Sequence, residues 1–444
     1  MLIHTMKRSD FDYNLPKELI AQKPAEVRHD SHLMIVKKDG KGRNIIEHKH
    51  FYDIIDYLKE GDVLVVNNTK VLPFKFLGRK ETGGKAEMIL GNRIVDDEDY
   101  KGEINYKKDY KENYKKGKNR YECRIKTTKA RIGTKLIFGD NTKKEDKKYQ
   151  KEKLSHETCW SMSGDNKEKE IKSCFQSHIR IKATIVDKIE DKYIIEFDRD
   201  YSVEELSMIG EIPLPPYIKD YKGDVSKYQT VYSRYYERRN NENEDRKNNV
   251  EKTGSIAAPT AGLHFTDELL DKIRKKGVKI AEVCLHVSFG TFIPVRYDDI
   301  IKHKMEAEYY IVDEKSANII NSRKFTDKNG KFIDTNGIEK TGRLFVVGTT
   351  ALKTLETAAD DNGKSDGDRK ICAKKGWSSL FIYPGYKFKV KVDGFITNFH
   401  LPKSTLIMLV SAYFGRENIL DAYNIAVKEK YRFFSFGDAM MLVK

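Results

Sequence analysis

The chain has 444 residues, of which 34% are charged and 39% hydrophobic, enough apolar residues for a sizeable core. Its formal net charge of +15 suits a polyanionic partner, although Lys-rich surface insertions produce the same excess. Five cysteines without a Cys-x-x-Cys pair indicate neither a disulfide framework nor a zinc site. Because no apolar leader or membrane-length apolar segment is present, we expect a cytoplasmic protein.

Short strands dominate the first half of the chain. A buried strand is predicted over 61–66, and after Pro73 short apolar runs with Gly-rich turns follow at 74–78, 86–90, 121–127, 135–138, 179–189 and 193–197. Several strands without intervening helices predict a small antiparallel β-barrel. A mixed helix-and-strand pattern returns at Gly210. We therefore predict a large α/β domain, 1–70 and 210–444, with an inserted small barrel domain, 71–209.

Hydrophilic segments interrupt this plan. They are rich in Lys, Asp, Glu, Asn and Gly, so they bury little apolar surface and are predicted to be mobile loops: 96–119, 140–178, 236–252, 326–342 and 360–375. Residues 100–121 interleave Lys with Tyr, a composition typical of nucleic-acid binding. We favour a solvated insertion for this run, since Asp and Glu dilute its charge.

The stretch 254–268 has the composition of a ligand loop. Small residues around Pro259, including Gly262, let a backbone come close to a ligand, and Thr260 and His264 supply polar groups. Thr266 is predicted to cap a helix over 267–276, which ends at Gly277 before a strand at 278–287. A close-packed turn with a solvated His264 is the alternative interpretation.

Two further junctions have the same form of strand, polar turn and helix start. The strand 344–347 is followed by Gly348, Thr349 and Thr350 and a predicted helix over 351–359. A second strand ends in Asn398 and His400, and a helix begins near Ser404. Free N–H groups at helix starts bind anions, and open α/β sheets bind ligands at the carboxyl ends of their strands. The three junctions are therefore the predicted ligand site.

These motifs resemble those of the S-adenosylmethionine:tRNA ribosyltransferase-isomerases of queuosine biosynthesis. The resemblance covers most of the chain, and its long motifs occur in the family's order. They are 9–13, 19–22, 28–33, 61–73, 78–85, 210–218, 228–232, 254–268, 285–295, 348–356, 392–410 and 431–441.

Besides Ser288, which stands where the family has Gly, the chain departs from the family pattern at four positions. Asn68 and Lys70 stand where the family usually has Asp and Arg, Glu306 where it has His, and Lys353 where Arg is common. Arg and Lys are not equivalent at bidentate sites, and Glu306 removes a group that titrates near neutral pH. These changes motivate an alternative function, a catalytically impaired tRNA-binding protein of the same fold. A methyltransferase is disfavoured because the usual strand–Gly-x-Gly-x-Gly loop is missing.

The resemblance implies that the ribosyl part of S-adenosylmethionine is transferred to 7-aminomethyl-7-deazaguanine at the tRNA wobble position. Isomerisation there gives epoxyqueuosine, and adenine and methionine are released. The expected partners are this tRNA and S-adenosylmethionine, which is consumed as a substrate. No metal or other cofactor and no membrane are expected, and we expect a monomer because no long apolar amphipathic face is left over.

The chemistry requires a base for the substrate ammonium group and a proton donor to departing adenine. Histidine suits both steps near neutral pH, although each histidine also fits a structural role. The candidate catalytic residues are His264, His286, His400 and Asp438. The candidate substrate-binding residues are Thr260, Gly262, Phe265, Gly290, Thr291, Thr349, Thr350, Asn398, Lys403, Ser404, Thr405 and Arg432. Among these, Thr349-Thr350 and Ser404-Thr405 are the two alternative sites for the methionine carboxylate.

Overall fold

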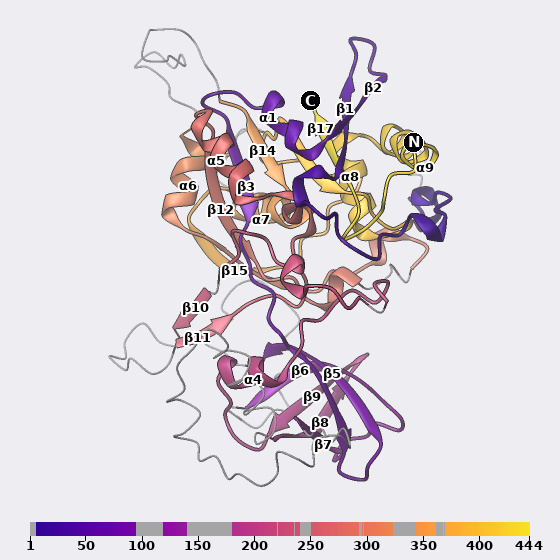
Figure 1. The fold of residues 1–444 in the computed structure, drawn as a ribbon, viewed down its shortest axis with the longest axis vertical. Coiled ribbons are helices and arrows are strands. Elements are labelled where there is room, and N and C mark those ends of the chain that lie inside the picture. Colours follow the sequence, from indigo (N-terminus) through magenta and orange to yellow (C-terminus); the bar gives the residue numbers. More distant parts are fainter. Residues whose placement is uncertain are drawn as a thin grey trace. The chain divides into compact units, whose positions relative to one another are not determined.

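The computed structural model describes residues 6–94, 119–139, 180–219, 221–234, 236–239, 250–292, 295, 297–322, 342–360, 367 and 369–444 (Figure 1). The chain forms two compact units, Met1–Val71 with Leu214–Tyr235 and Ala257–Lys444, and Leu72–Pro213 with Tyr236–Ile256. The boundaries predicted at 70/71 and 209/210 lie a few residues from these divisions. The segment 236–256, which we had placed in the large domain, groups with the second unit. The Lys- and Tyr-rich run at 100–118 lies outside the described residues.

The second unit contains a closed antiparallel barrel, as predicted. Its strands follow one another around the barrel in the order β4 (Lys75–Lys80), β5 (Lys85–Arg93), β6 (Arg120–Thr127), β9 (Lys192–Phe197), β8 (Ile181–Ile189) and β7 (Lys135–Phe138). Alternate side chains fill the interior, as Leu136 and Phe138 do from β7, because successive residues of a strand point to opposite faces. Helix α4 (Val203–Ile209) packs Leu206 against the same core.

Two segments predicted to be loops contain strands. In 236–252, β10 (Tyr236–Arg239) pairs antiparallel with β11 (Val250–Thr253). In 360–375, Ile371 is buried and β15 (Lys374–Ser378) begins, pairing with β13 (Glu308–Val312). Backbone hydrogen bonds form a strand ladder whether or not the strands contain a long apolar run. The prediction of loops from hydrophilic composition was therefore wrong for these two segments.

The first unit is built on a nine-stranded mixed sheet. Its order is β15-β13-β12-β3-β14-β16-β17-β1-β2, with β12 at Lys279–Leu285, β3 at Val63–Asn67, β14 at Leu344–Val347, β16 at Gly394–Asn398, β17 at Ala439–Val443, β1 at His32–Lys38 and β2 at Asn44–His50. The four central strands β12, β3, β14 and β16 are parallel, while β17 runs antiparallel to β16 and parallel to β1.

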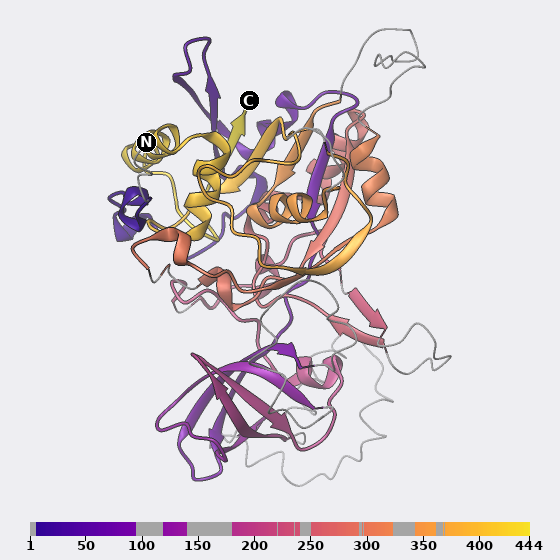
Figure 2. The same ribbon diagram turned by 180° about the vertical axis from the view of Figure 1, so that it is seen from behind.

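Helices cover both faces of this sheet (Figures 1 and 2). Val63 and Val65 of β3 join one apolar cluster, whereas Leu64 and Val66 join the other, because strand side chains alternate. The first cluster includes side chains of α6 (Glu314–Asn321), α7 (Thr349–Ala358), α8 (Thr405–Phe414) and α9 (Arg416–Lys428). The second includes side chains of α1 (Ile54–Tyr57) and α5 (Asp267–Lys275). The predicted fold class, a large α/β domain with a small barrel, is confirmed.

One edge of the sheet gathers the predicted junctions. The carboxyl ends of the four parallel strands meet there, and the pairing of Asn398 with Ala439 and of Leu33 with Ala439 places the starts of β17 and β1 beside them. We call this edge the strand-end edge. Within the described ranges, no helix is long and apolar enough to cross a membrane.

Local capping agrees with the sequence at these junctions. Thr266 caps α5, its hydroxyl accepting from the Leu269 N–H at 3.2 Å, and Ser404 caps α8 in the same way through Ile407. Gly277, after α5, has a φ of 83°, a left-handed conformation that glycine adopts without strain. Helix α7 begins at Thr349, two residues earlier than predicted.

Candidate functional site

A first polar cluster lies where β16, β17 and β1 meet the 254–268 loop. His264 ends a 3-10 turn at Thr260–His264, and its ring is buried against Phe51, with ring centroids 4.9 Å apart. The Nδ1 atom lies 2.6 Å from Ser31 Oγ, and Nε2 lies 3.3 Å from Asn398 Nδ2. The structure therefore brings together the predicted residues His264 and Asn398, and adds Ser31.

The hydrogen bonds around His264 specify its tautomer. Asn398 Nδ2 donates to the Phe434 carbonyl at 2.9 Å, which fixes the orientation of the amide, so the other Nδ2 hydrogen faces His264 Nε2. Nε2 must then be the bare acceptor, and Nδ1–H donates to Ser31. The Ser31 hydroxyl in turn donates to the Arg28 carbonyl at 3.2 Å. His264 is thus held as a neutral imidazole.

Burial reinforces this state, because desolvation lowers the pKa of His264 to about 4, even though the carboxylate of Asp438 opposes the shift. Asp438 does not hydrogen-bond the ring. Its carboxylate accepts from the Arg432 backbone N–H at 2.8 Å and from Arg432 Nη2 at 2.9 Å, and from the His32 N–H at 3.2 Å. Asp438 therefore holds the turn before β17 together and supplies a negative field near His264.

We expect this histidine to make the fold acid-sensitive. The unfolded imidazole, with an ordinary pKa near 6.5, takes up its proton at a higher pH than the folded one. The stabilisation is complete above about pH 6.5 and is lost as the pH falls towards 4, with about 2 kcal/mol lost between pH 7 and pH 5. Urea unfolding at both pH values should show a smaller loss for His264→Gln than for the wild type.

A matched variant, His303→Gln, removes a half-buried histidine outside the site. It should retain the wild-type difference between the two pH values. Equal acid sensitivity of His264→Gln and the wild-type protein would contradict the assignment.

His400 stands beside this cluster, just after β16. Its Nε2 lies 2.7 Å from Thr397 Oγ1, its N–H donates to the Tyr423 hydroxyl at 3.0 Å, and its carbonyl accepts from the Tyr13 hydroxyl. Burial lowers the pKa of His400 to about 3, so this ring is also neutral at physiological pH.

A second cluster lies over β12, β3 and β14. His286 Nδ1 is 2.8 Å from Thr69 Oγ1, and the ring stacks on Tyr309. Asn67, at the end of β3, donates from Nδ2 to Thr350 Oγ1 at 3.0 Å and to the Leu285 carbonyl at 3.1 Å. These bonds join the ends of three neighbouring strands.

Cys284 lies in this cluster, its Sγ 3.5 Å from His286 Nδ1. Burial raises the pKa of the thiol well above its usual value, so the sulfur is not a thiolate nucleophile at neutral pH.

A buried ion pair fixes the turn that follows β12. Lys353 Nζ of α7 lies 3.0 Å from Glu308 Oε2 of β13, and both residues are 5% exposed. Glu308 Oε1 also accepts from the Ser288 N–H at 3.1 Å, and the Ser288 hydroxyl lies 3.3 Å from Glu306 Oε2. The lysine found where the family often has Arg thus still provides a cation to a buried carboxylate.

The two helix starts differ as anion sites. Ser404 occupies the N-terminus of α8 with its own hydroxyl, and that hydroxyl also donates to the Leu401 carbonyl at 2.8 Å. Helix α7 has Gly348 at its N-cap, with a φ of 86° and no side chain to cap the first turn. The start of α7 at Thr349-Thr350 is therefore the better place for a carboxylate.

Three of the predicted binding residues make other contacts in the structure. Phe265 is fully buried between Phe51 and Tyr232, so it is a core residue and cannot stack on a substrate. Gly262 serves packing, since a Cβ there would come within 2.0 Å of the Tyr232 hydroxyl. Lys403, with a φ of 61°, forms an ion pair with Asp12 at 2.7 Å on the surface.

The other predicted binding residues are not gathered at one point. Arg432 is engaged with Asp438, and Thr405 is buried in the first turn of α8. Thr260 and Gly290 are partly exposed in their turns, and the side chain of Thr291 lies outside the described residues.

Sequence reasoning missed Ser31, Asn67 and Thr69. Each is a polar residue at the end of an otherwise apolar strand, directly before β1 or at the end of β3. Asn67 and Thr69 follow the same pattern as Asn398, at the carboxyl end of a strand, so that pattern could have identified both, whereas Ser31 precedes the amino end of β1 and does not fit it.

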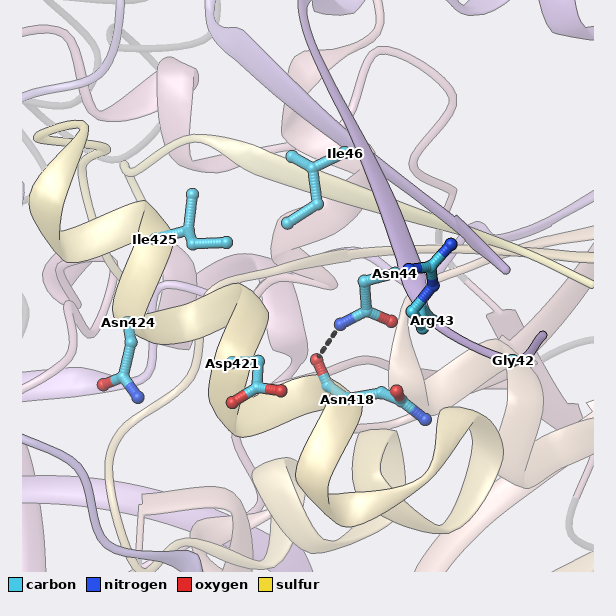
Figure 3. Close-up of a pocket in the computed structure, with 8 residues that line it drawn as sticks. All are labelled: Gly42, Arg43, Asn44, Ile46, Asn418, Asp421, Asn424 and Ile425. Atoms are coloured by element: carbon cyan, nitrogen blue, oxygen red, sulfur yellow. Dashed lines mark hydrogen bonds between the residues drawn. The ribbon is translucent and has the colours of Figure 1, made fainter. Parts of the chain in front are cut away.

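A pocket of about 570 Å³ lies between β2 and α9 (Figure 3). Asn44 donates from Nδ2 to the Asn418 carbonyl across it at 2.8 Å. Asn44 pairs with Lys38, whereas His50 pairs with His32, so the pocket lies at the opposite end of β1 and β2 from the strand-end edge. It is not part of the candidate site. No group of three or more potential metal ligands occurs among the described residues.

Comparison with known proteins places the chain among queuosine enzymes. A family model described as queuosine biosynthesis protein matches residues 8–442. The S-adenosylmethionine:tRNA ribosyltransferase-isomerase of Acetivibrio thermocellus is 43% identical over 441 residues, covering 98% of this chain and 100% of that protein. The crystal structure of the S-adenosylmethionine tRNA ribosyltransferase of Thermotoga maritima is 28% identical, with 98% of this chain and 100% of that chain covered and a TM-score of 0.44.

Proposed function

Because the chain belongs to the queuosine biosynthesis family, as an S-adenosylmethionine:tRNA ribosyltransferase-isomerase, we propose that it transfers and isomerises the ribosyl part of S-adenosylmethionine. The acceptor is the aminomethyl group of 7-aminomethyl-7-deazaguanine at the wobble position of a tRNA. The products are epoxyqueuosine in the tRNA, adenine and methionine. S-adenosylmethionine is consumed, and the reaction uses no separate cofactor.

The observation that carries this proposal is the convergence of three histidines on one sheet edge. His264, His286 and His400 come from three separate motifs, and each lies at or beside the strand-end edge. Burial lowers the pKa of His264 to about 4 and that of His400 to about 3, so both rings are unprotonated at neutral pH. Such an edge is where open α/β sheets hold their ligands.

We assign roles within this edge as follows. His264 takes the proton of the substrate ammonium group at Nε2, where the ammonium replaces the Asn398 N–H as the donor. Asn398 Oδ1, which is buried and has no protein partner among the described residues, accepts a hydrogen bond from a substrate N–H. His400 and His286 are the candidates for proton transfer at the ribosyl carbon or at departing adenine. The methionine carboxylate binds at the start of α7, at Thr349 and Thr350.

Liquid chromatography of a reaction with S-adenosylmethionine and the substrate tRNA tests this function. We expect adenine and methionine to appear together, in equal amounts, and only when the tRNA carries the aminomethyl base. Binding of the tRNA without adenine release would instead indicate a catalytically impaired tRNA-binding protein. Formation of S-adenosylhomocysteine would indicate a methyltransferase.

A further inference from the structure

Six rings form a continuous row in the first unit, at the edge of the sheet formed by β1 and β2; five of them are partly or fully exposed, and the sixth, Tyr431, is buried at 3% exposure. We call it the aromatic row, and it consists, in spatial order, of His29, Tyr52, His50, His32, Tyr431 and His48. Neighbouring ring centroids along the row are 6.2, 5.2, 5.4, 5.7 and 5.7 Å apart.

The row is built by the pairing of the two strands and by the turn that follows β2. His32 and His50 are opposite one another in the antiparallel ladder, so their rings lie on one face. Tyr52 then stacks on His50 with an interplanar angle of 6°. Tyr52 is 41% exposed and the His32 side chain 58% exposed, so part of the row faces solvent.

The row is continuous with the candidate site. The His32 N–H donates to Asp438, and the preceding residue, Ser31, contacts His264. Between His50 and Tyr52, Phe51 turns to the opposite side and stacks on His264. The row therefore adjoins the His264 cluster in the chain, through Ser31 next to His32 and through Phe51 between His50 and Tyr52.

We propose that the aromatic row is a stacking platform for the unpaired nucleotides that flank the modified base in the tRNA anticodon loop. Flat, exposed rings are the means by which proteins hold single-stranded RNA without reading its sequence, because every base has a π-face. Arg432, partly exposed beside the row on Asp438, carries a positive charge towards the RNA backbone. This inference rests on the proposed function, which brings a tRNA loop to the strand-end edge.

The test uses the full chain and a short anticodon stem-loop RNA, with binding followed by fluorescence anisotropy. The double variant His50→Ala/Tyr52→Ala is expected to weaken RNA binding by about 5- to 100-fold, the range for loss of stacking on one base. The ring-retaining variant Tyr52→Phe should bind as the wild type does. Tyr297→Ala, which removes a 52% exposed tyrosine outside the row, is the matched control and should also bind normally.

Enzyme kinetics give a second readout. The double variant should show a raised KM for tRNA with kcat for adenine release nearly retained, and unchanged affinity for S-adenosylmethionine. Wild-type RNA affinity in the double variant would overturn the inference while leaving the proposed function intact. A loss confined to S-adenosylmethionine affinity would also overturn it, since the rings would then hold that nucleoside. Failure of the wild-type protein to bind any stem-loop would overturn the proposed function together with the inference.

Discussion

Replacing Lys353 by methionine is expected to lower the free energy of unfolding by about 3–5 kcal/mol. The change leaves the buried Glu308 carboxylate without the Lys353 cation, while its hydrogen bond from the Ser288 N–H in the turn after β12 is retained. A buried charge that loses its partner is costly because desolvation is no longer offset by Coulomb attraction. Chemical denaturation monitored by circular dichroism measures the loss.

Three variants separate this cause from others. Lys353→Arg keeps a cation at the position and should retain most of the stability. The double variant Lys353→Met/Glu308→Gln leaves no buried charge and should recover part of the loss. Lys272→Met removes the lysine of a solvent-exposed pair with Glu268 on α5 and should change stability little. A single variant Lys353→Met as stable as the wild type would contradict a stabilising role for this ion pair.

The ion pair also bears on the four departures from the family pattern. Lys353 and Asn68 both make defined contacts, Asn68 donating from Nδ2 to Glu282 Oε2 at 2.9 Å. Glu306 accepts from the Ser288 hydroxyl in the same turn as the ion pair. Asn68, Glu306 and Lys353 are thus integrated into the hydrogen bonding near the strand ends.

The parts of the fold that follow a short-range pattern could be predicted from the sequence. The barrel strands alternate apolar and polar residues. Thr266 indicates the start of α5 because its hydroxyl caps the helix. The junctions at Gly348 and Asn398 were found because polar residues follow buried strands. A residue whose role depends only on its neighbours in the sequence, such as a helix cap, can be identified from a single stretch of sequence.

The partners of the site could not be predicted in this way. Ser31 and His264 are 233 positions apart, and only the sheet brings them into contact. Phe265 lies in a loop with the composition of a ligand loop, but its ring is buried in the core. Its neighbours in the sequence therefore did not indicate where the ring points. The strands β10 and β11 lie in charged segments, where backbone pairing leaves no compositional signal.

His264→Gln is expected to lower turnover by about 10²- to 10⁴-fold at saturating substrates, the usual contribution of a placed proton-transfer group. Glutamine keeps a neutral polar side chain at the buried position but has no basic nitrogen. Affinity for tRNA should change little, because the RNA is held mainly through its backbone and through contacts away from this ring. His400→Gln should behave in the same way, and adenine release measured beside tRNA binding tests both.

The stacking of His264 on Phe51 makes a packing control necessary. Phe51→Leu loosens the stack while retaining the imidazole and its bonds to Ser31 and Asn398, so it should lose stability but much less turnover than His264→Gln. Asn398→Ala removes the amide that occupies Nε2 together with the unpartnered Oδ1, and turnover should fall because the substrate N–H loses its acceptor. If His264→Gln and His400→Gln both keep wild-type adenine release, the base does not lie at the part of the strand-end edge formed by β16, β17 and β1. Asp438 and Glu308 are poorly suited to replace it, since each already accepts from a cation, and His286 would then be the remaining candidate of the three histidines.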